Sequence, residues 1–262
     1  MKTPRAFDVF GNIALVKFDR KTNIKDRKLF ANKILNDNKS IKTVLEKTQK
    51  FKGRLRKQQT KHLAGEKTKE ALYRENNCVF RFHVDKTYFS PRLSNERKEI
   101  SQQVKKKDEV LVMFAGVSPY SIVIAKISRA KKIYSNEINR EANKYAGLNI
   151  ELNNLKGRVE LLPGDIKRVA LKLKKKRKKF GVIVMPRPQL KETFLHEAFM
   201  LSTKGTKIFY YDFCKEDEID SIVEKIKAEA KKARKKIKIL KIKKAGEIAP
   251  YRYRIRIDFR VL

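Results

Sequence analysis

Three residues in the middle of the chain have the types and spacing of a nucleoside-binding site. Gly116 follows an apolar run that ends at Phe114, Glu137 lies about 20 residues further on, and Asp165 ends a Gly-Asp dipeptide. A glycine turn lets backbone N–H groups approach a ligand, and a carboxylate after the next strand can accept both ribose hydroxyls. Asp165 stands where an adenine amino group could be read. Each acid alone is more often a solvated residue, but the three together indicate a nucleoside cofactor.

The elements that must position these residues alternate along the chain. The predicted strands cover residues 108–114, 132–136, 158–162, 180–185, 206–213, 237–242 and 251–261. The predicted helices cover residues 120–128, 139–152, 192–201 and 216–236. The last two strands follow each other without a helix, whereas a plain dinucleotide-binding fold would alternate to the end. We therefore expect an α/β fold with the seven-stranded, Rossmann-like sheet of a class I methyltransferase.

The chain before this region predicts a smaller unit. Residues 7–19 read FDVFGNIALVKFD and predict a hairpin around Gly11-Asn12. The spacing in residues 28–35 and 40–47 is helical or mixed, and the basic segment 48–61 is read either as a solvated loop or as a functional segment. We expect a small α+β domain over residues 1–70 and a class I methyltransferase domain over residues 71–262.

The segment that joins the two units carries a strand signal and a helix signal. Residues 78–88 alternate apolar and polar residues, which predicts a strand element. Ser94 is an acceptable N-cap for a helix over residues 95–104, and Glu96 lies in the first turn of that helix, where the helix dipole favours an acid.

The charge of the chain indicates a polyanionic partner. The 262 residues include 66 Lys and Arg against 29 Asp and Glu, a net charge of +37. Strong self-repulsion follows unless the working partner is a polyanion, and nucleic acid is the first candidate. A heat-adapted or salt-adapted surface is the alternative, but heat adaptation usually enriches Glu together with Lys.

Several other classes of protein receive no support. Two cysteines without a CxxC spacing and three scattered histidines predict neither a disulfide framework nor a metal site. No apolar stretch approaches the roughly 20 residues that cross a bilayer, and the start Met1–Arg5 carries no secretory pattern. We expect a cytoplasmic protein with no membrane partner.

Six motifs along the chain are shared with one protein family. They are YFSPRLSNERKEI (residues 88–100), MFAGVSPYSI (113–122), FDVFGNIALVKF (7–18), HLAGEKTKEALYREN (62–76), YYDFCKEDE (210–218) and APYRYRIRIDFRV (249–261). These motifs resemble the tRNA (guanine-37-N1)-methyltransferase family of archaea and eukaryotes, with its wyosine-pathway relatives. The resemblance covers nearly the whole chain. Many archaeal members carry an extra N-terminal tRNA-binding domain, and this chain is expected to start directly at the second domain. The resemblance implies that residues 1–70 are a tRNA-recognition domain.

The resemblance implies a cofactor, a substrate and the residues that bind them. It implies that S-adenosylmethionine binds at Tyr88, Phe114, Ala115, Gly116, Glu137 and Asp165. It implies a catalytic set of Arg56, Arg92, Glu96 and Arg97. Guanine N1 carries a proton at neutral pH, so methylation needs a base, expected to be Glu96, and a cation at O6, expected to be Arg56.

The chain departs from the family pattern at three places. Val112 replaces the usual acid before Phe-Ala-Gly, Ser118 stands where the family commonly has glycine, and residues 185–188 read Met-Pro-Arg-Pro instead of Asn-Leu-Pro or Asn-Pro-Pro. Loss of that Asn leaves the methylated atom open and argues against an amino-group methyltransferase.

Two basic tracts suggest contacts with RNA phosphates. Residues 172–179 are basic at seven of eight positions, and residues 225–244 hold eleven basic residues and one acid. The RNA-binding residues are expected to include Arg54, Lys175, Lys176, Arg177 and Pro186. We expect tRNA as the partner of a monomer that methylates guanosine 37. Methylation of the tricyclic wyosine intermediate, alone or in addition, stays open, as does a non-catalytic RNA-binding protein, for which Val112 is the support.

Overall fold

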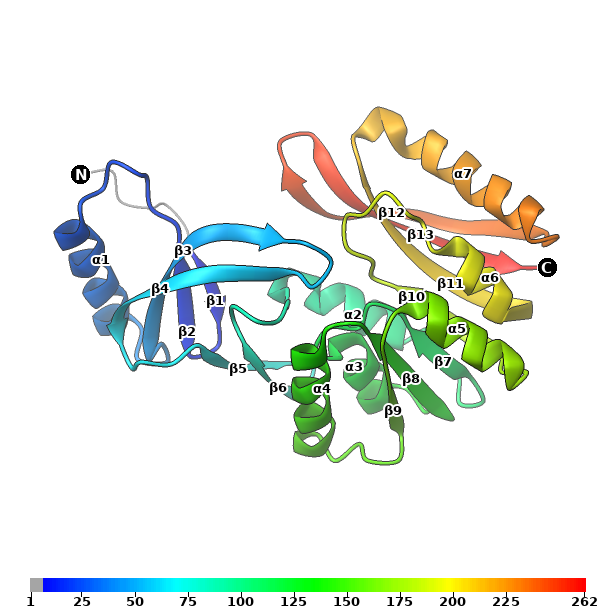
Figure 1. Cartoon of the computed structure of the whole chain (residues 1–262), viewed down its shortest axis with the longest axis horizontal. Coiled ribbons are helices and arrows are strands. Elements are labelled where there is room, and N and C mark those ends of the chain that lie inside the picture. The colour runs from blue at the N-terminus through cyan, green and yellow to red at the C-terminus, as the bar shows by residue number, and fades with distance from the viewer. Residues whose placement is uncertain (1–6) are drawn as a thin grey trace.

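The computed structural model describes residues 7–262, apart from the side chains of residues 50–52. The Met1–Arg5 start considered for a secretory pattern lies outside the described residues. Figure 1 shows a smaller sheet with one helix towards the N-terminus and a larger sheet with helices on both faces.

The smaller sheet is built around one parallel pair of strands. Its elements are β1 (Asp8–Phe10), β2 (Ile13–Val16), α1 (Ile24–Asp37), β3 (Thr43–Lys52) and β4 (Lys57–Gly65). The strand order is β1-β2-β3-β4, and α1 connects the parallel strands β2 and β3. Ala31 and Ile34 of α1 pack in one buried cluster with Val16 and Val44 of these strands.

For two segments in this part of the chain, the structure excludes one of the alternatives that the sequence leaves open. Residues 40–47 do not continue a helix, because Thr43–Glu46 lie buried in β3 between two neighbouring strands. β-branched residues in a doubly flanked strand favour this outcome over their mixed spacing. Residues 48–61 are not a solvated loop either, since they form the β3–β4 hairpin, which turns at Gly53 with a positive φ of 66°.

A second hairpin and a short helix lead into the larger sheet. β5 (Glu70–Glu75) pairs with β6 (Cys78–His83), and the single-turn 3-10 helix η1 (Pro91–Leu93) runs directly into α2 (Ser94–Ser101). The N-cap is therefore Leu93 and not Ser94, which lies inside α2, and its hydroxyl accepts a hydrogen bond from the Asn76 amide at 3.1 Å. Glu96 does lie in the first turn of α2.

The larger sheet has seven strands, as the sequence predicts. They are β7 (Glu109–Val112), β8 (Lys132–Glu137), β9 (Val159–Pro163), β10 (Phe180–Met185), β11 (Ser202–Cys214), β12 (Ile237–Ala249) and β13 (Arg252–Val261). The order is β12-β13-β11-β10-β7-β8-β9, with β7 to β11 parallel and β13 antiparallel to both of its neighbours. The predicted class I, Rossmann-like α/β fold is confirmed.

Helices cover both faces of this sheet. With α2, one face carries α3 (Pro119–Ile127) and α4 (Arg140–Leu152), and the other carries α5 (Ile166–Lys175), α6 (Leu195–Leu201), the short η2 (Glu216–Glu218) and α7 (Ile219–Lys232). Successive strand residues point to opposite faces, so Val112 and Val184 pack with α3 while Met113 and Met185 pack with the other layer.

Several element boundaries differ from the predicted ones, and two of these differences have a local physical reason. The helix predicted from residue 192 begins at Leu195, because Phe194 adopts a left-handed conformation with φ 58°. β12 continues to Ala249 instead of ending at residue 242, because its ladder with β13 persists through the polar residues Lys243 and Lys244. An edge strand accepts lysines, since one of its sides faces water.

The described helices and the His, Cys, Asp and Glu side chains bear on membrane crossing, metal binding and thiol chemistry. None of the helices between residues 7 and 262 combines the length and the apolar character that a membrane crossing requires. Within that same range, no group of three His, Cys, Asp or Glu side chains is arranged to hold a metal ion. Cys78 and Cys214 are free and buried, and burial raises the pKa of each thiol to about 11.

Val112 provides a test of how the missing acid has been accommodated. Its side chain is 0% exposed and packs in the apolar layer under α3. Val112→Asp should therefore lower the free energy of unfolding by about 3 kcal/mol, because it buries a charge among apolar groups. Thermal unfolding measures the loss, with Val112→Thr as the control of similar size. An unchanged melting temperature together with tighter cofactor binding would show instead that the pocket still accepts the acid.

Candidate functional site

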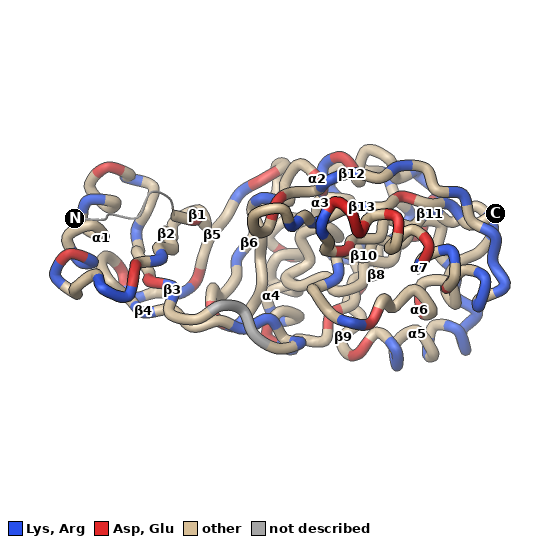
Figure 2. The backbone as a smooth tube through the Cα atoms, turned by 90° about the horizontal axis from the view of Figure 1, so that it is seen from above, with Lys and Arg blue, Asp and Glu red and all other residues tan. Residues whose placement is uncertain are grey.

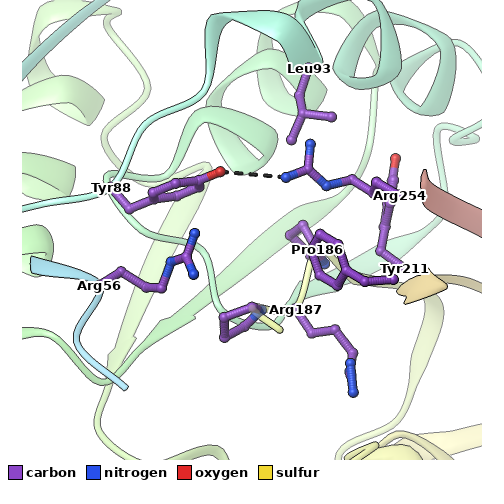
Figure 3. Close-up of a pocket in the computed structure, with 9 residues that line it drawn as sticks. Arg56, Tyr88, Leu93, Pro186, Arg187, Tyr211 and Arg254 are labelled. Carbon is purple, nitrogen blue, oxygen red and sulfur yellow. Dashed lines mark hydrogen bonds between the residues drawn. The ribbon is translucent and has the colours of Figure 1, made fainter. Parts of the chain in front are cut away.

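Two adjoining cavities open at the carboxyl ends of β7 to β10, where open α/β sheets bind their ligands. The first, termed the acceptor pocket, is lined by Arg56, Tyr88, Pro186, Tyr211, Phe213 and Arg254, and Figure 3 shows it. The second, termed the nucleoside pocket, is lined by Phe114, Asn136, Ile138, Asp165, Leu190 and Phe194. Pro188 lines both, so the two cavities are neighbours.

Aromatic rings form the apolar wall of the nucleoside pocket. The ring centroids of Phe114 and Phe194 lie 4.9 Å apart at an interplanar angle of 64°. Both residues have positive φ, 56° and 58°, which is uncommon for bulky side chains. Such backbone strain persists where the surrounding structure enforces it, and it clusters at ligand sites. The wall has the apolar character that the flat face of a nucleobase requires.

Gly116 and Glu137 face each other across the adjoining turn. The Gly116 N–H donates to one Glu137 carboxylate oxygen and the Asn139 N–H donates to the other, both at 2.7 Å. Burial raises the pKa of Glu137, against the effect of these bonds. Each oxygen keeps a lone pair for a ribose hydroxyl. A Cβ at position 116 would lie 3.2 Å from the Tyr88 carbonyl oxygen, so glycine permits this close approach.

The turn of the β3–β4 hairpin reaches the nucleoside pocket from the smaller sheet. Asp165 caps α5 by accepting the Lys167 N–H at 3.0 Å, and its second oxygen accepts Arg54 at 2.9 Å. Burial opposes ionisation of Asp165, but these two bonds outweigh it and lower its pKa. The Asn139 amide donates to the carbonyl oxygen of Leu55 at 3.1 Å. Arg54, expected to contact RNA, thus lies beside the expected adenine acceptor.

The acceptor pocket places two cations around one phenol. The Arg56 guanidinium lies 4.6 Å from the centroid of the Tyr88 ring, and Arg254 donates to the Tyr88 hydroxyl at 3.5 Å (Figure 3). Burial by itself would raise the pKa of Tyr88, but Arg254 and Arg56 outweigh burial and lower it. Tyr88 is expected to contact the cofactor, but the structure places it in the lining of the acceptor pocket, next to the nucleoside pocket.

Glu96 lies behind this pocket in a buried ion cluster. One carboxylate oxygen accepts Arg256 at 2.6 Å and the Tyr211 hydroxyl at 2.9 Å, and the other pairs with Lys243 at 2.6 Å. Tyr211 lines the acceptor pocket and also accepts the Tyr120 hydroxyl at 3.0 Å. The Glu96 carboxylate is thus connected to the pocket through the hydroxyl of Tyr211.

The two remaining candidates for the catalytic set lie in different surroundings. Arg97 is buried and forms two bonds of 2.5 Å with the Glu75 carboxylate, in addition to one with the Ser90 carbonyl oxygen. Arg92 is exposed, pairs with Asp8 at 2.8 Å, and lines a wider cleft next to the acceptor pocket. Of the four expected catalytic residues, Arg56 is the one that lines the acceptor pocket.

Sequence reasoning did not single out Tyr211, Phe213, Arg254 or Arg256. Arg254, Arg256 and Asp258 alternate along β13, so they share one face of the strand. Charged side chains on one face of a strand inside an apolar sheet require oppositely charged partners. This alternation is the sequence pattern that could have indicated a buried ion cluster at Arg256. Which partners these side chains meet depends on α2, far away in the sequence, and a local pattern does not show it.

The Met-Pro-Arg-Pro segment places its arginine in the protein interior. Arg187 is 4% exposed, donates to Asp212 at 3.1 Å, and donates to the carbonyl oxygens of Leu190 and Glu192 at 2.7 and 3.1 Å. Its side chain extends away from Tyr88 in Figure 3. Arg187 braces the loop that separates the two pockets, and both Arg187 and the preceding Pro186 line the acceptor pocket.

The first basic tract lies at the opposite edge of the sheet. α5 starts at Asp165 beside the nucleoside pocket and runs back towards the start of β10, about 15 Å away. Lys175, Lys176 and Arg177 are exposed at that far end. Figure 2 shows that Lys and Arg are spread over both bodies of the molecule, including α5 and the C-terminal strands.

Comparisons with known proteins agree on one family over nearly the whole chain. The family model described as "TRM5/TYW2 methyltransferase domain" matches residues 71–240, and the one described as "TYW2 N-terminal domain" matches residues 1–68. The tRNA (guanine(37)-N(1))-methyltransferase Trm5b of Pyrococcus abyssi is 34% identical over 98% of this chain and 75% of its own. The tRNA (guanine(37)-N(1))/4-demethylwyosine(37)-methyltransferase Taw22 of Nanoarchaeum equitans is 34% identical over 98% of this chain and 100% of its own.

Solved structures show the same likeness. The crystal structure of Trm5b from Pyrococcus abyssi has a TM-score of 0.86 at 33% identity and covers 98% of this chain and 75% of its own. The complex of aTrm5 with tRNALeu has a TM-score of 0.85 at 28% identity, covering 98% of this chain and 72% of that one.

The ion cluster behind the acceptor pocket should make stability depend on pH. Hydrogen bonds from Arg256, followed by those from Lys243 and Lys241, lower the pKa of Glu99 from 4.5 to about 2. Because the pKa of Glu99 is lower in the folded state, the stabilisation that Glu99 contributes is complete above about pH 4.5 and is lost as the pH falls towards 2. Glu99→Gln should therefore reduce the free energy of unfolding at pH 7 by roughly 1–3 kcal/mol, and this difference should vanish near pH 2.

Urea unfolding of the wild type and the variant between pH 2 and 7 measures this difference. The matched control is Glu224→Gln, which removes an exposed carboxylate paired with Lys227 on α7 and should change little. A difference between Glu99→Gln and wild type that stays constant over the whole pH range would contradict the assigned charge pairing.

Proposed function

The chain belongs to the TRM5/TYW2 methyltransferase family, and from this premise we propose that it transfers a methyl group from S-adenosylmethionine to N1 of guanosine 37 in tRNA. The observation that carries the proposal is the pair of adjoining cavities at the carboxyl edge of the sheet. One is an apolar slot with carboxylates beside it, suited to a nucleoside, and the other is rich in cations and aromatic rings, suited to a base that gains negative charge.

The residues at the nucleoside pocket fit S-adenosylmethionine. Phe114 and Phe194 would form the apolar wall against the adenine, Asp165 would accept its amino group, and Glu137 would accept the ribose hydroxyls next to Ala115 and Gly116. When bound, the cofactor supplies an electrophilic methyl group. The turn at Arg54 and Leu55 covers this pocket from the smaller sheet, so the proposed division at residue 70 places part of the cofactor site in each domain.

The acceptor pocket supplies what methylation of guanine N1 requires. The N1 proton must leave before the nitrogen becomes nucleophilic, and negative charge then develops at O6. Arg56 is the proposed O6 partner, since its guanidinium lies in the pocket beside Tyr88. Glu96 is the proposed base, and the hydroxyl of Tyr211 connects it to the pocket.

Methylation of the tricyclic wyosine intermediate is the second candidate, alone or in addition. Two observations favour it: the relative from Nanoarchaeum equitans is named for both reactions, and the N-terminal match is described as a TYW2 domain. The Met-Pro-Arg-Pro segment lacks the Asn that often follows the fourth strand in the family, which leaves the methylated atom open between the two reactions.

The deciding experiment is mass spectrometry of tRNA nucleosides after incubation with the protein and S-adenosylmethionine. Transcripts that carry either guanosine or the tricyclic base at position 37 separate the two reactions. Titration calorimetry with the cofactor tests the non-catalytic alternative, since silence at millimolar cofactor would favour an RNA-binding protein. We further propose a monomer that acts on tRNA in the cytoplasm, where its substrate is found.

Glu96→Gln tests the proposed base. The variant keeps the size of the side chain but cannot accept the N1 proton, so single-turnover methyl transfer should fall roughly 10²- to 10⁴-fold. Arg56→Ala should also lose rate, by about 2–4 kcal/mol of transition-state stabilisation, and this loss should persist at high pH. The Glu96 variant should partly recover at high pH, because N1 then deprotonates unaided.

Two controls separate chemistry from folding in this test. Melting temperature and the affinities for tRNA and cofactor report whether loss of the Glu96–Arg256 bond disturbs the fold. Tyr211→Phe removes the hydroxyl between Glu96 and the pocket, and it should lower the rate if the proton passes through that hydroxyl. Near-normal transfer to guanosine by Glu96→Gln at neutral pH would assign the base to another residue or the acceptor to another atom.

The basic tract on α5 makes a separate prediction about salt. Affinity for tRNA should fall by one to several orders of magnitude between about 50 and 200 mM salt, since phosphate contacts release counterions. Replacing Lys175, Lys176 and Arg177 by Ala should reduce the slope of log K against log salt by roughly one for each phosphate that the variant no longer neutralises, while cofactor affinity stays constant.

The matched control replaces Lys105, Lys106 and Lys107, an equal change of charge in the exposed run before β7. Equal effects of both triple variants would mean that the α5 tract contributes only to the overall electrostatic attraction between protein and tRNA, without contacting phosphates.

A further inference from the structure

The turn of the β12–β13 hairpin holds an aromatic residue in an unusual position. The ladder pairs Ala249 with Arg252, which leaves Pro250 and Tyr251 as a two-residue turn. Tyr251 occupies the second central position with φ 58°, where glycine or asparagine is usual, and Pro250 suits the first. The Tyr251 N–H is fixed by the Glu247 carboxylate at 3.2 Å.

The Tyr251 ring is turned outwards. The residue is 80% exposed, the largest value among the exposed large apolar side chains of the described chain. Ile248, 40% exposed, lies beside it, and these two residues line a shallow depression together with Pro250 and Tyr253. A strained backbone position that presents an aromatic ring to solvent is not explained by packing inside the protein, and it points to a ligand outside.

The hairpin forms one wall of the wider cleft. Residues 245–248 line this cleft, and Lys17 and Arg92 line it from other elements. The acceptor pocket and the cleft share Arg56, Tyr88 and Arg254, so a base in the pocket enters from this side. Figure 1 shows the end of the hairpin projecting towards the smaller sheet. The depression at Tyr251 adjoins this cleft, since Glu247 and Ile248 line both. An exposed ring beside a cleft lined by cations is the composition that binds unpaired RNA.

We propose that the hairpin tip is a second nucleobase site, in which an unpaired base of the RNA substrate stacks on the ring of Tyr251. This inference rests on the proposed function, because the RNA concerned is the tRNA whose base at position 37 enters the acceptor pocket. An enzyme that extracts one base from a stack leaves neighbouring bases without a partner. An exposed ring at the rim replaces the missing stacking.

The absence of tryptophan from the sequence permits a direct test. Tyr251→Trp creates a single-tryptophan protein, and stacking of a base should quench its fluorescence when unmodified tRNA transcript is added. The matched control is Leu148→Trp, an exposed position on α4, which lies on the opposite side of the molecule from the hairpin in Figure 1. Transcripts with one abasic position at a time in the anticodon loop should identify the base, because quenching disappears with it.

Measurements of tRNA affinity provide a second test of the proposed base site. Tyr251→Ala should weaken tRNA binding roughly 5- to 100-fold, and Tyr251→Phe should retain it. The salt slope should stay constant in Tyr251→Ala, because no phosphate contact is removed. Tyr251→Gly should weaken binding equally while its melting temperature is unchanged or higher, since glycine fits the positive φ. A purely structural role of Tyr251 does not combine weaker binding with a fold of equal or greater stability.

The outcomes distinguish this inference from the proposed function. If wild type methylates tRNA while Tyr251→Ala binds it normally and Tyr251→Trp shows no quenching, the second base site is wrong and the enzyme assignment stands. If wild type neither binds nor methylates tRNA, the proposed function fails first. Quenching that persists with every abasic transcript would also overturn the inference, because it would reflect proximity of the RNA without stacking.

Discussion

The buried guanidinium of Arg256 is the interaction on which the arrangement of the site depends. It is 0% exposed and bonds to Glu96, Glu99 and Asp258. Two of these carboxylates belong to α2 and the third to β13 itself, so one side chain fixes the helix against the last strand of the sheet. Burial lowers the pKa of Arg256, but its carboxylate partners outweigh burial and raise it, so it stays charged. Removal of the guanidinium would leave the buried Asp258 carboxylate without its hydrogen-bonded cation.

The sheet was predictable from the sequence, and the ion cluster was not. Apolar runs such as residues 180–185 read as buried strands because both faces of a parallel strand are covered. Glu137 and Asp165 were predictable as ends of strands, since the carboxyl ends of parallel strands share one edge. Glu96, in contrast, meets Arg256 across 160 positions of sequence. Composition and periodicity carry no information about contacts of that range.

The β3–β4 hairpin shows a related limit for the smaller sheet. Its basic, polar sequence lacks the apolar alternation of a strand, yet the segment pairs with itself because β3 begins beside β2. Tertiary pairing overrides a weak local preference. The hairpin then reaches the nucleoside pocket, where Arg54 meets Asp165 and Leu55 meets Asn139. A site assembled from two sheets cannot be predicted until the position of each sheet relative to the other is known.

The distribution of charge explains why the fold and a polyanionic partner are coupled. Several carboxylates are engaged inside the protein or at its cavities: Glu75 with Arg97, Asp165 with Arg54, and Glu96 with Arg256. The net charge of +37 therefore falls mainly on the surface, where the lysines repel one another and lower the stability of the compact state. A partner that binds the folded chain through its phosphates removes this repulsion and stabilises the fold by mass action. The same surface charge that weakens the isolated protein would thus strengthen the proposed complex with tRNA.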